Sequence, residues 1–181
     1  MKAEYSIVNI VTSAILNERL DLSHIAKELP AEYDPTSFPG VIYQIQNPRA
    51  SFLLFSSGKM ICAGTKNIQD ANTAIEKVTS RLQQIGINVA SLKIDVQNIV
   101  STGDLHGFID LEETAKTLEK TIYEPEQFPG LIVKWPDPKV AFLLFSSGRF
   151  VCAGAKKEEE IKKAVEALEN KLEEETLILY L

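Results

Sequence analysis

The chain has few of the residues from which disulfide frameworks, metal sites and active sites are usually built. Its 181 residues include two cysteines, two histidines and one tryptophan. The cysteines fall at equivalent places in two apolar segments, which indicates buried thiols in a reducing environment rather than a disulfide framework. Neither His24 nor His106 belongs to a metal-ligand spacing. We therefore expect no metal and no cofactor.

Features of enzymes and membrane proteins are also missing. The Gly-x-x-x-x-Gly-Lys-Ser/Thr order of a phosphate loop is absent, and no nucleophile is paired with a base, so we do not expect an enzyme. No apolar run has the length that crosses a bilayer, and the first residues lack the pattern of a signal peptide. We expect a cytoplasmic protein that contacts no membrane.

Positive charge is not in excess. The net charge is −6; residues 1–90 carry eight basic and eight acidic groups, and residues 91–181 carry eleven and seventeen. This balance argues against tight, sequence-blind binding to nucleic acid. Net charge describes the whole molecule, however, and does not exclude a local basic rim.

What the chain does contain is a long internal repeat. The segment Phe-Leu-Leu-Phe-Ser-Ser-Gly at 52–58 returns at 142–148, and ten of thirteen positions are identical between 52–64 and 142–154. Phe-Pro-Gly at 38–40 returns at 128–130, and Asn-Ile-Val at 9–11 returns at 98–100. The sequence therefore predicts two copies of one unit, residues 1–90 and 91–181, which form one continuous domain.

Each copy shows the pattern of an α+β unit. Apolar residues at helical spacing predict a long helix over 66–85 and another containing 161–172. Asp21 and Asp110 are good N-caps for two shorter helices. Strands are expected at 5–12 and 92–101, and turn residues divide the rest into two antiparallel meanders: 40–46, 50–55 and 59–65, then 130–135, 140–145 and 149–155.

These strands are apolar on both faces. Residues 52–55 and 60–63 do not alternate between apolar and polar, although two helices per copy can cover only one face of a sheet. Because side chains alternate along a strand, Leu53 and Phe55 share one face while Leu54 and Cys62 point toward the helices. We expect the face that carries Leu53 and Phe55 to be an exposed apolar surface, and hence a binding site.

The repeated segments, together with Tyr-Glu-Pro-Glu-Gln-Phe-Pro-Gly at 123–130, resemble the TATA-box-binding protein family over roughly residues 5–175. The resemblance implies a saddle of two pseudo-twofold repeats, with a curved ten-stranded antiparallel sheet and four helices on its convex face. It implies a general transcription initiation factor that binds A/T-rich promoter DNA in the minor groove and bends it. The expected partners are transcription factor B and, indirectly, RNA polymerase. The short N-terminus and acidic C-terminal end indicate the archaeal type, associated with the nucleoid.

The resemblance also assigns roles to particular residues. Two phenylalanines per repeat are expected to wedge between base steps: Phe38, Phe55, Phe128 and Phe145. Minor-groove contacts are expected from Asn9, Val11, Leu53, Ile61, Ala63, Asn98, Val100, Leu143, Val151 and Ala153. Phosphate contacts are expected from Arg49, Lys59, Lys66, Lys139, Arg149 and Lys156. Glu124 and Glu126 are expected to contact transcription factor B.

Two alternatives stay open at this point. Ala63 and Ala153 stand where the family commonly has threonine, so one hydrogen-bonding hydroxyl is missing in each half, and a divergent paralogue with a less strict TATA preference is one alternative. A protein- or lipid-binding module could instead use the concave apolar sheet for another ligand. That alternative does not explain the paired asparagines or the basic residue after each Ser-Ser-Gly turn. A homodimer that closes the concave faces together without DNA is compatible with either.

Overall fold

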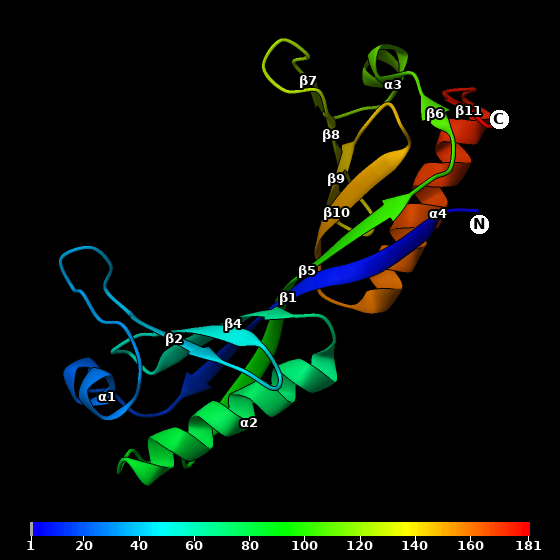
Figure 1. Ribbon diagram of the computed structural model, residues 1–181. Coiled ribbons are helices and arrows are strands. Elements are labelled where there is room, and N and C mark those ends of the chain that lie inside the picture. The colour runs from blue at the N-terminus through cyan, green and yellow to red at the C-terminus, as the bar shows by residue number, and fades with distance from the viewer. Residues whose placement is uncertain (1) are drawn as a thin grey trace. The chain divides into compact units, whose positions relative to one another are not determined.

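The computed structural model describes residues 2–181, which form two compact units. The N-unit is Asn9–Gln97; the C-unit is residues 98–181 together with residues 2–8. Each unit is an antiparallel sheet with helices packed against it, so the predicted α+β class is confirmed (Figure 1). Among the described residues, no helix combines the length and the apolar character that crossing a membrane requires.

The N-unit contains the first repeat's meander and its long helix. Its strands are hydrogen-bonded in the order β2-β3-β4-β1-β5. Asp21 begins α1 by accepting a hydrogen bond from the His24 backbone N–H at 3.1 Å, and Pro30 follows the helix. Asn67 caps α2 in the same way, through the Asp70 N–H. The elements are β1 (Glu4–Leu16), α1 (Leu22–Glu28), β2 (Val41–Ile45), β3 (Ala50–Leu54), β4 (Lys59–Thr65), α2 (Ile68–Gln84) and β5 (Leu92–Asp104).

The C-unit repeats this plan with additions. Its strands follow the order β1-β5-β10-β9-β8-β7, and β1 and β5 continue into it from the N-unit. Asp110 begins α3 by accepting from the Glu113 N–H at 3.0 Å. The elements are β6 (Phe108–Ile109), α3 (Leu111–Thr117), β7 (Thr121–Tyr123), β8 (Leu131–Trp135), β9 (Val140–Leu144), β10 (Arg149–Ala155), α4 (Glu158–Glu174) and β11 (Ile178–Leu179).

The two repeats differ at one edge of the sheet. In the C-unit β7 pairs with β8 over three residues, whereas the corresponding place in the N-unit holds a single bridge between Glu32 and Ile42. The main sheet thus has nine strands, with that bridge where a tenth would lie. In addition, β6 and β11 form a separate two-stranded sheet that the sequence did not indicate.

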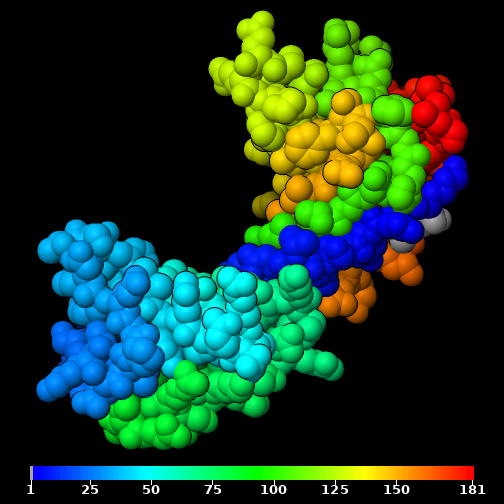
Figure 2. All heavy atoms as spheres, viewed as in Figure 1, coloured from blue at the N-terminus to red at the C-terminus, as the bar shows by residue number. Residues whose placement is uncertain are grey.

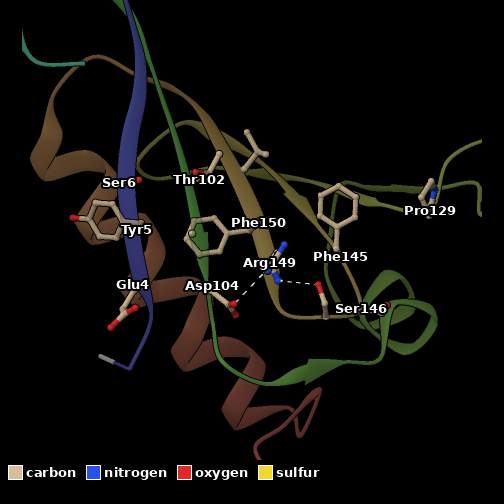
Figure 3. Close-up of a pocket in the computed structure, with 13 residues that line it drawn as sticks. Glu4, Tyr5, Ser6, Thr102, Asp104, Pro129, Phe145, Ser146, Arg149 and Phe150 are labelled. Carbon is tan, nitrogen blue, oxygen red and sulfur yellow. Dashed lines mark hydrogen bonds and ion pairs between the residues drawn. The ribbon is translucent and has the colours of Figure 1, made fainter. Parts of the chain in front are cut away.

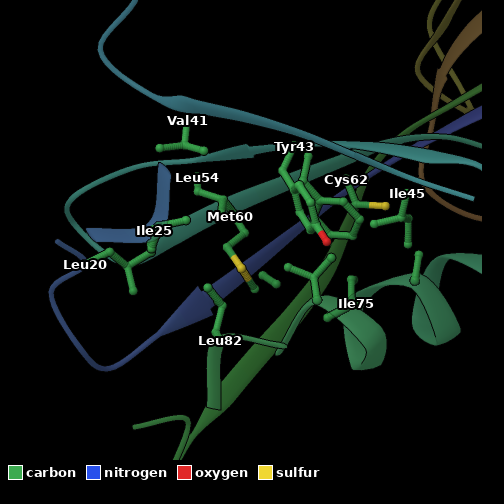
Figure 4. Packing of buried hydrophobic residues seen from close by; sticks show 14 of the residues in the cluster. Leu20, Ile25, Val41, Tyr43, Ile45, Leu54, Met60, Cys62, Ile75 and Leu82 are labelled. Atoms are coloured by element: carbon green, nitrogen blue, oxygen red, sulfur yellow. The ribbon is translucent and has the colours of Figure 1, made fainter. Parts of the chain in front are cut away.

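The core of each unit lies between the meander and the long helix. In the N-unit Leu54, Met60 and Cys62 are fully buried and lie toward Ile75 and Leu82 of α2 (Figure 4). The counterparts of the three strand residues in the C-unit, Leu144, Phe150 and Cys152, are equally buried. The predicted orientation of Leu54 and Cys62 is therefore confirmed, and the other face of the strands is left without a helix.

A buried carboxylate fixes the start of the chain to the C-unit. Glu169 of α4 is 3% exposed, and one of its oxygens accepts hydrogen bonds from the backbone N–H groups of Lys2 (2.8 Å) and Ala3 (2.9 Å). The equivalent position of the first repeat is Thr79, which cannot bind a chain end in this way. These bonds join the start of the chain to α4 of the same unit.

Candidate nucleic-acid interface

The sheet face opposite the long helix is apolar and open in both units. Leu53 lies opposite Ile61 across β3 and β4, and Leu143 lies opposite Val151 across β9 and β10. Their neighbours along each strand are buried. All ten residues expected to contact a minor groove are half-buried: Asn9, Val11, Leu53, Ile61, Ala63, Asn98, Val100, Leu143, Val151 and Ala153. The apolar face is thus accessible in each unit and is not sealed by the chain's own layers.

The register adds residues that the sequence analysis missed. Ile42 pairs with Leu53 and Ile132 pairs with Leu143, and both isoleucines are half-buried. Thr102, opposite Val151, is exposed on the same face. The sequence held the signal for the isoleucines. Each has an apolar residue on both sides in its strand, and strand alternation places those neighbours toward the helix and the isoleucine on the opposite face.

The four phenylalanines form two equivalent pairs. The ring centroids of Phe38 and Phe55 are 5.8 Å apart with an interplanar angle of 63°, and those of Phe128 and Phe145 are 6.1 Å apart at 68°. Such edge-to-face packing is a favourable arrangement for aromatic rings. Phe128 is 44% exposed and the other three are half-buried. Each pair is therefore rigidly supported and still accessible.

Glycine in each Phe-Pro-Gly segment makes room for these pairs. A Cβ atom at Gly40 would lie 2.9 Å from Cε1 of Phe38 and 3.2 Å from Cε1 of Phe55. At Gly130 it would lie 2.7 Å from Cε1 of Phe128. These distances are all shorter than the optimal carbon–carbon separation of about 3.5–4.0 Å, and the contacts with Phe38 and Phe128 are the closest. Any larger residue would displace the rings.

The two asparagines are held in one orientation. Asn9 Oδ1 accepts a hydrogen bond from the Gly64 N–H, and Asn98 Oδ1 accepts one from the Gly154 N–H, both at 2.7 Å. Gly64 and Gly154 have φ values of +99° and +103°, which favour glycine, and they lie at irregularities in the pairing of β4 with β1 and of β10 with β5. Since each oxygen is occupied, the side chain offers its two N–H donors to a ligand.

The six basic residues expected to contact phosphates are all exposed. One of them is paired: Arg149 Nε lies 4.0 Å from Asp104 Oδ2. Both line a hollow of about 950 Å³ in the C-unit, where Phe145 and Thr102 also lie (Figure 3). The equivalent of Arg149 in the first repeat is Lys59, and the equivalent of Asp104 is Ile15. The basic rims of the two repeats therefore differ.

The turns that precede the two Phe-Pro-Gly segments also differ. The Asp34 carboxylate accepts hydrogen bonds from the Thr36 hydroxyl (2.6 Å) and the Thr36 N–H (3.1 Å), which lower the pKa of that carboxyl below its ordinary value. Within residues 2–181 no hydrogen bond or ion pair engages the carboxylates of Glu124 and Glu126. Their segment, near residues 120–130, stands out from the rest of the C-unit (yellow-green in Figure 2).

Phe142, Trp135 and His24 belong to the packing. Phe142 is buried against Trp135 and Phe150, with ring centroids 6.2 and 5.9 Å apart, so its bulk lies on the helix-covered side. His24 is half-buried and its Nε2 lies 2.9 Å from the carbonyl oxygen of Ile85, which joins α1 to the end of α2. None of these side chains lies on the open apolar face.

Comparisons with known proteins agree with this geometry. Residues 4–85 and 93–175 each match the model of a family described as transcription factor TFIID, or TATA-binding protein. The chain belongs to the TATA-binding protein family. The match covers both repeats separately, and the resemblance predicted from the duplicated segments is confirmed. This family is one of transcription factors, so the chain is not an enzyme.

Individual members of the TATA-binding protein family are similar along almost the whole chain. The TATA-box-binding protein of Pyrobaculum calidifontis is 45% identical over 172 residues, covering 94% of this chain and 86% of the relative. That of Sulfurisphaera tokodaii is 43% identical over 175 residues, covering 96% and 88%. The solved structure of Methanococcus jannaschii TBP superposes with a TM-score of 0.86 at 40% identity, covering 94% of this chain and 99% of that one.

Proposed function

We propose that this chain is a general transcription initiation factor that binds A/T-rich, TATA-type promoter DNA in the minor groove. The observation that carries the proposal is the open apolar face, which in both units holds a phenylalanine pair and an asparagine with fixed orientation. A minor groove at A·T and T·A pairs presents only acceptors, so an outward amide donor fits either pair. Apolar side chains suit the rest of such a groove.

The phenylalanine pairs are proposed to bend the DNA by wedging between base steps, which is how members of this family are known to act. Burial of four rings would contribute about 6–12 kcal/mol, at about 1.5–3 kcal/mol each. Smooth bending of a site costs about 1–6 kcal/mol, and about 10 kcal/mol for a stiff sequence. Because these quantities are comparable, sequences that unstack easily are favoured. Specificity would then come largely from DNA deformability.

The C-unit turn is the proposed contact for transcription factor B, which in turn recruits RNA polymerase. Glu124 and Glu126 are exposed, and their carboxylates have no partner within the described chain. The first repeat has Asp34 at the position of Glu124, where the carboxylate is already hydrogen-bonded within its own turn. At these two turn positions a basic partner would therefore find two carboxylates without an internal hydrogen bond in the second repeat, and in the first repeat only the hydrogen-bonded Asp34. This difference would let the partner distinguish the two halves.

The experiment that tests DNA binding compares a TATA duplex with a scrambled G·C duplex in a gel-shift assay. Dyes at the two DNA ends report bending by energy transfer. We expect binding and bending only with the TATA duplex, and loss of both in Phe55→Ala and Phe145→Ala. Phe108→Ala is the matched control, because Phe108 is 55% exposed in β6 and lies on neither apolar face. Equal binding to both duplexes, or full bending by the wedge variants, would refute the proposal.

The partner proposal has its own test. Glu124→Gln and Glu126→Gln together should abolish the additional shift caused by transcription factor B and leave the shift by the chain alone unchanged. Glu119→Gln with Glu32→Gln removes two exposed carboxylates elsewhere and serves as the control. If the partner binds the Glu124 and Glu126 variant normally, another surface recruits it.

A further inference from the structure

A second hollow of the C-unit, of about 710 Å³, lies beside the turn that joins β8 to β9. Its most prominent lining residues are four lysines around Trp135: Lys120, Lys134, Lys139 and Lys156. All four are exposed, and within residues 2–181 the ion pairs involve other basic residues. Four unpaired ammonium groups around one hollow indicate a site for a polyanion.

The acidic residues near this hollow do not neutralise it. None of them lines it in the described chain. Asp137, in the adjacent turn, is ion-paired to Lys163 at 3.8 Å, and Glu160 accepts a hydrogen bond from the Lys156 backbone N–H at 3.0 Å. Glu119, the neighbour of Lys120 in sequence, is exposed. The lining of the hollow therefore carries four positive charges and no negative one.

The hollow continues the open apolar face of the C-unit. Ala153 belongs to both, and Lys134 pairs with Ala141, which lies two residues from Leu143 on the same face of β9. The Lys134 N–H donates to the Lys120 carbonyl oxygen at 3.0 Å, which places the two lysine backbones side by side. Trp135 packs edge-on against buried Phe142 and forms a fixed apolar wall. A duplex bound on the apolar face would bring its sugar–phosphate backbone to this edge.

The first repeat lacks half of these charges. At the displacement of 90, Arg49 and Lys66 correspond to Lys139 and Lys156, but Pro30 and Gln44 stand where the second repeat has Lys120 and Lys134. This difference in the number of lysines is independent of the ion pair between Arg149 and Asp104, because those two residues line the other hollow. The second repeat thus has two additional free ammonium groups at its edge.

We infer that Lys120 and Lys134, with Lys139 and Lys156, bind backbone phosphates of duplex DNA, so that the second repeat makes two phosphate contacts that the first does not. The inference rests on the proposed DNA binding and deepens it. Phosphate contacts carry no sequence information, but they fix the position of the protein on the duplex. The two repeats would therefore bind the two halves of the DNA site with unequal strength.

The test is the salt dependence of binding to the TATA duplex by the full chain. Each phosphate contact contributes about 0.9 to the slope of log affinity against log salt, so Lys120→Asn with Lys134→Gln should make the slope shallower by about 1.8. The ratio of wild-type to variant affinity should then fall about tenfold between 50 and 200 mM salt. Asparagine is chosen at position 120 because Lys120 has a φ of 53°, a conformation that asparagine tolerates.

Two further variants complete the design. Lys27→Gln with Lys162→Gln removes two exposed charges from α1 and α4 and should leave the slope unchanged. Gln44→Lys, which supplies the first repeat with the missing lysine, should steepen it by about 0.9. An unchanged slope in the Lys120 and Lys134 variant, with wild-type binding intact, would overturn this inference alone. A wild-type chain that binds no duplex would overturn the proposed function as well.

Discussion

The side-chain oxygen of Asn9 accepts a hydrogen bond from the backbone N–H of Gly64 at 2.7 Å. Asn98 and Gly154 repeat this bond with the same length. The strand irregularity at each glycine turns its N–H toward the asparagine, and this leaves the amide donors free. In the proposed complex, an amide that was free to rotate could present its oxygen to the minor groove, where acceptors would repel it. The glycines thus determine which atoms the asparagines present on the open face.

Replacement of the asparagines by aspartate should separate the role of the side-chain oxygen, which binds the glycine N–H, from that of the amide donors, which are left free. Asn9→Asp and Asn98→Asp keep an oxygen for the glycine N–H but remove the donors and add a negative charge. We expect each to lower affinity for a TATA duplex at least tenfold, with an unchanged melting temperature. Gel shift and thermal unfolding measure the two effects. Asn170→Asp, exposed on α4, is the control and should retain full affinity.

Alanine in the Phe-Pro-Gly segments should disturb bending. At Gly130 the new methyl group would lie 2.7 Å from Phe128 Cε1 and 2.9 Å from Leu143 Cδ1, so the phenylalanine pair must shift. We expect Gly130→Ala to reduce bending measured by energy transfer, and to destabilise the fold by about 1–3 kcal/mol. The double variant with Phe128→Ala should recover part of the stability and none of the bending. Normal bending by Gly130→Ala would show that the pair is not positioned by the glycine.

The two thiols should be inert in the folded protein. Burial raises the pKa of the Cys62 thiol from 9.0 to about 11, and that of Cys152 to about 12. At pH 8 both thiols should fail to react with a disulfide reagent until denaturant is added, and then both should react. Because the unfolded thiols ionise first, the free energy of unfolding should fall as the pH rises above about 9 toward the folded values. Rapid reaction of the native protein would contradict this burial.

The buried carboxylate of α4 should contribute to stability. Glu169→Ala leaves the backbone N–H groups of Lys2 and Ala3 without their acceptor, and we expect a loss of about 1–3 kcal/mol in urea unfolding. Glu173→Ala is the matched control on the same helix. It removes two exposed contacts, the ion pair with Lys2 at 3.3 Å and the hydrogen bond from the Tyr180 hydroxyl at 2.7 Å, and should cost less than Glu169→Ala. Equal losses in the two variants would argue against a special role for Glu169.

Much of the fold could be predicted because the same strand and helix patterns occur in both repeats. Strand alternation placed Leu54 and Cys62 in the core, and it left Leu53 and Phe55 on the open face, where they are half-buried. The N-caps Asp21 and Asp110 also begin their helices as expected. These features depend on local spacing, which a single sequence shows directly.

Other features could not be predicted, because they depend on contacts between distant segments. The bond from Gly64 to Asn9 joins strands separated by 55 positions in sequence. The bond from Lys2 to Glu169 joins almost the two ends of the chain. The hollow around Trp135 requires the loop before β7 to lie beside β8 and β10, so the sequence did not associate Lys120 and Lys134 with Lys139 and Lys156. Only the hydrogen-bond register brings such residues together.

The two longest strands have a consequence for how this protein can be divided. β1 gives residues 4–8 to the C-unit and its remainder to the N-unit, and β5 passes from one unit to the other between Gln97 and Asn98. Both places where the chain passes from one unit to the other thus lie within strands. A cut that separates them must sever strand backbone, so neither half is a module that evolution or an engineer can transplant by exchanging loops.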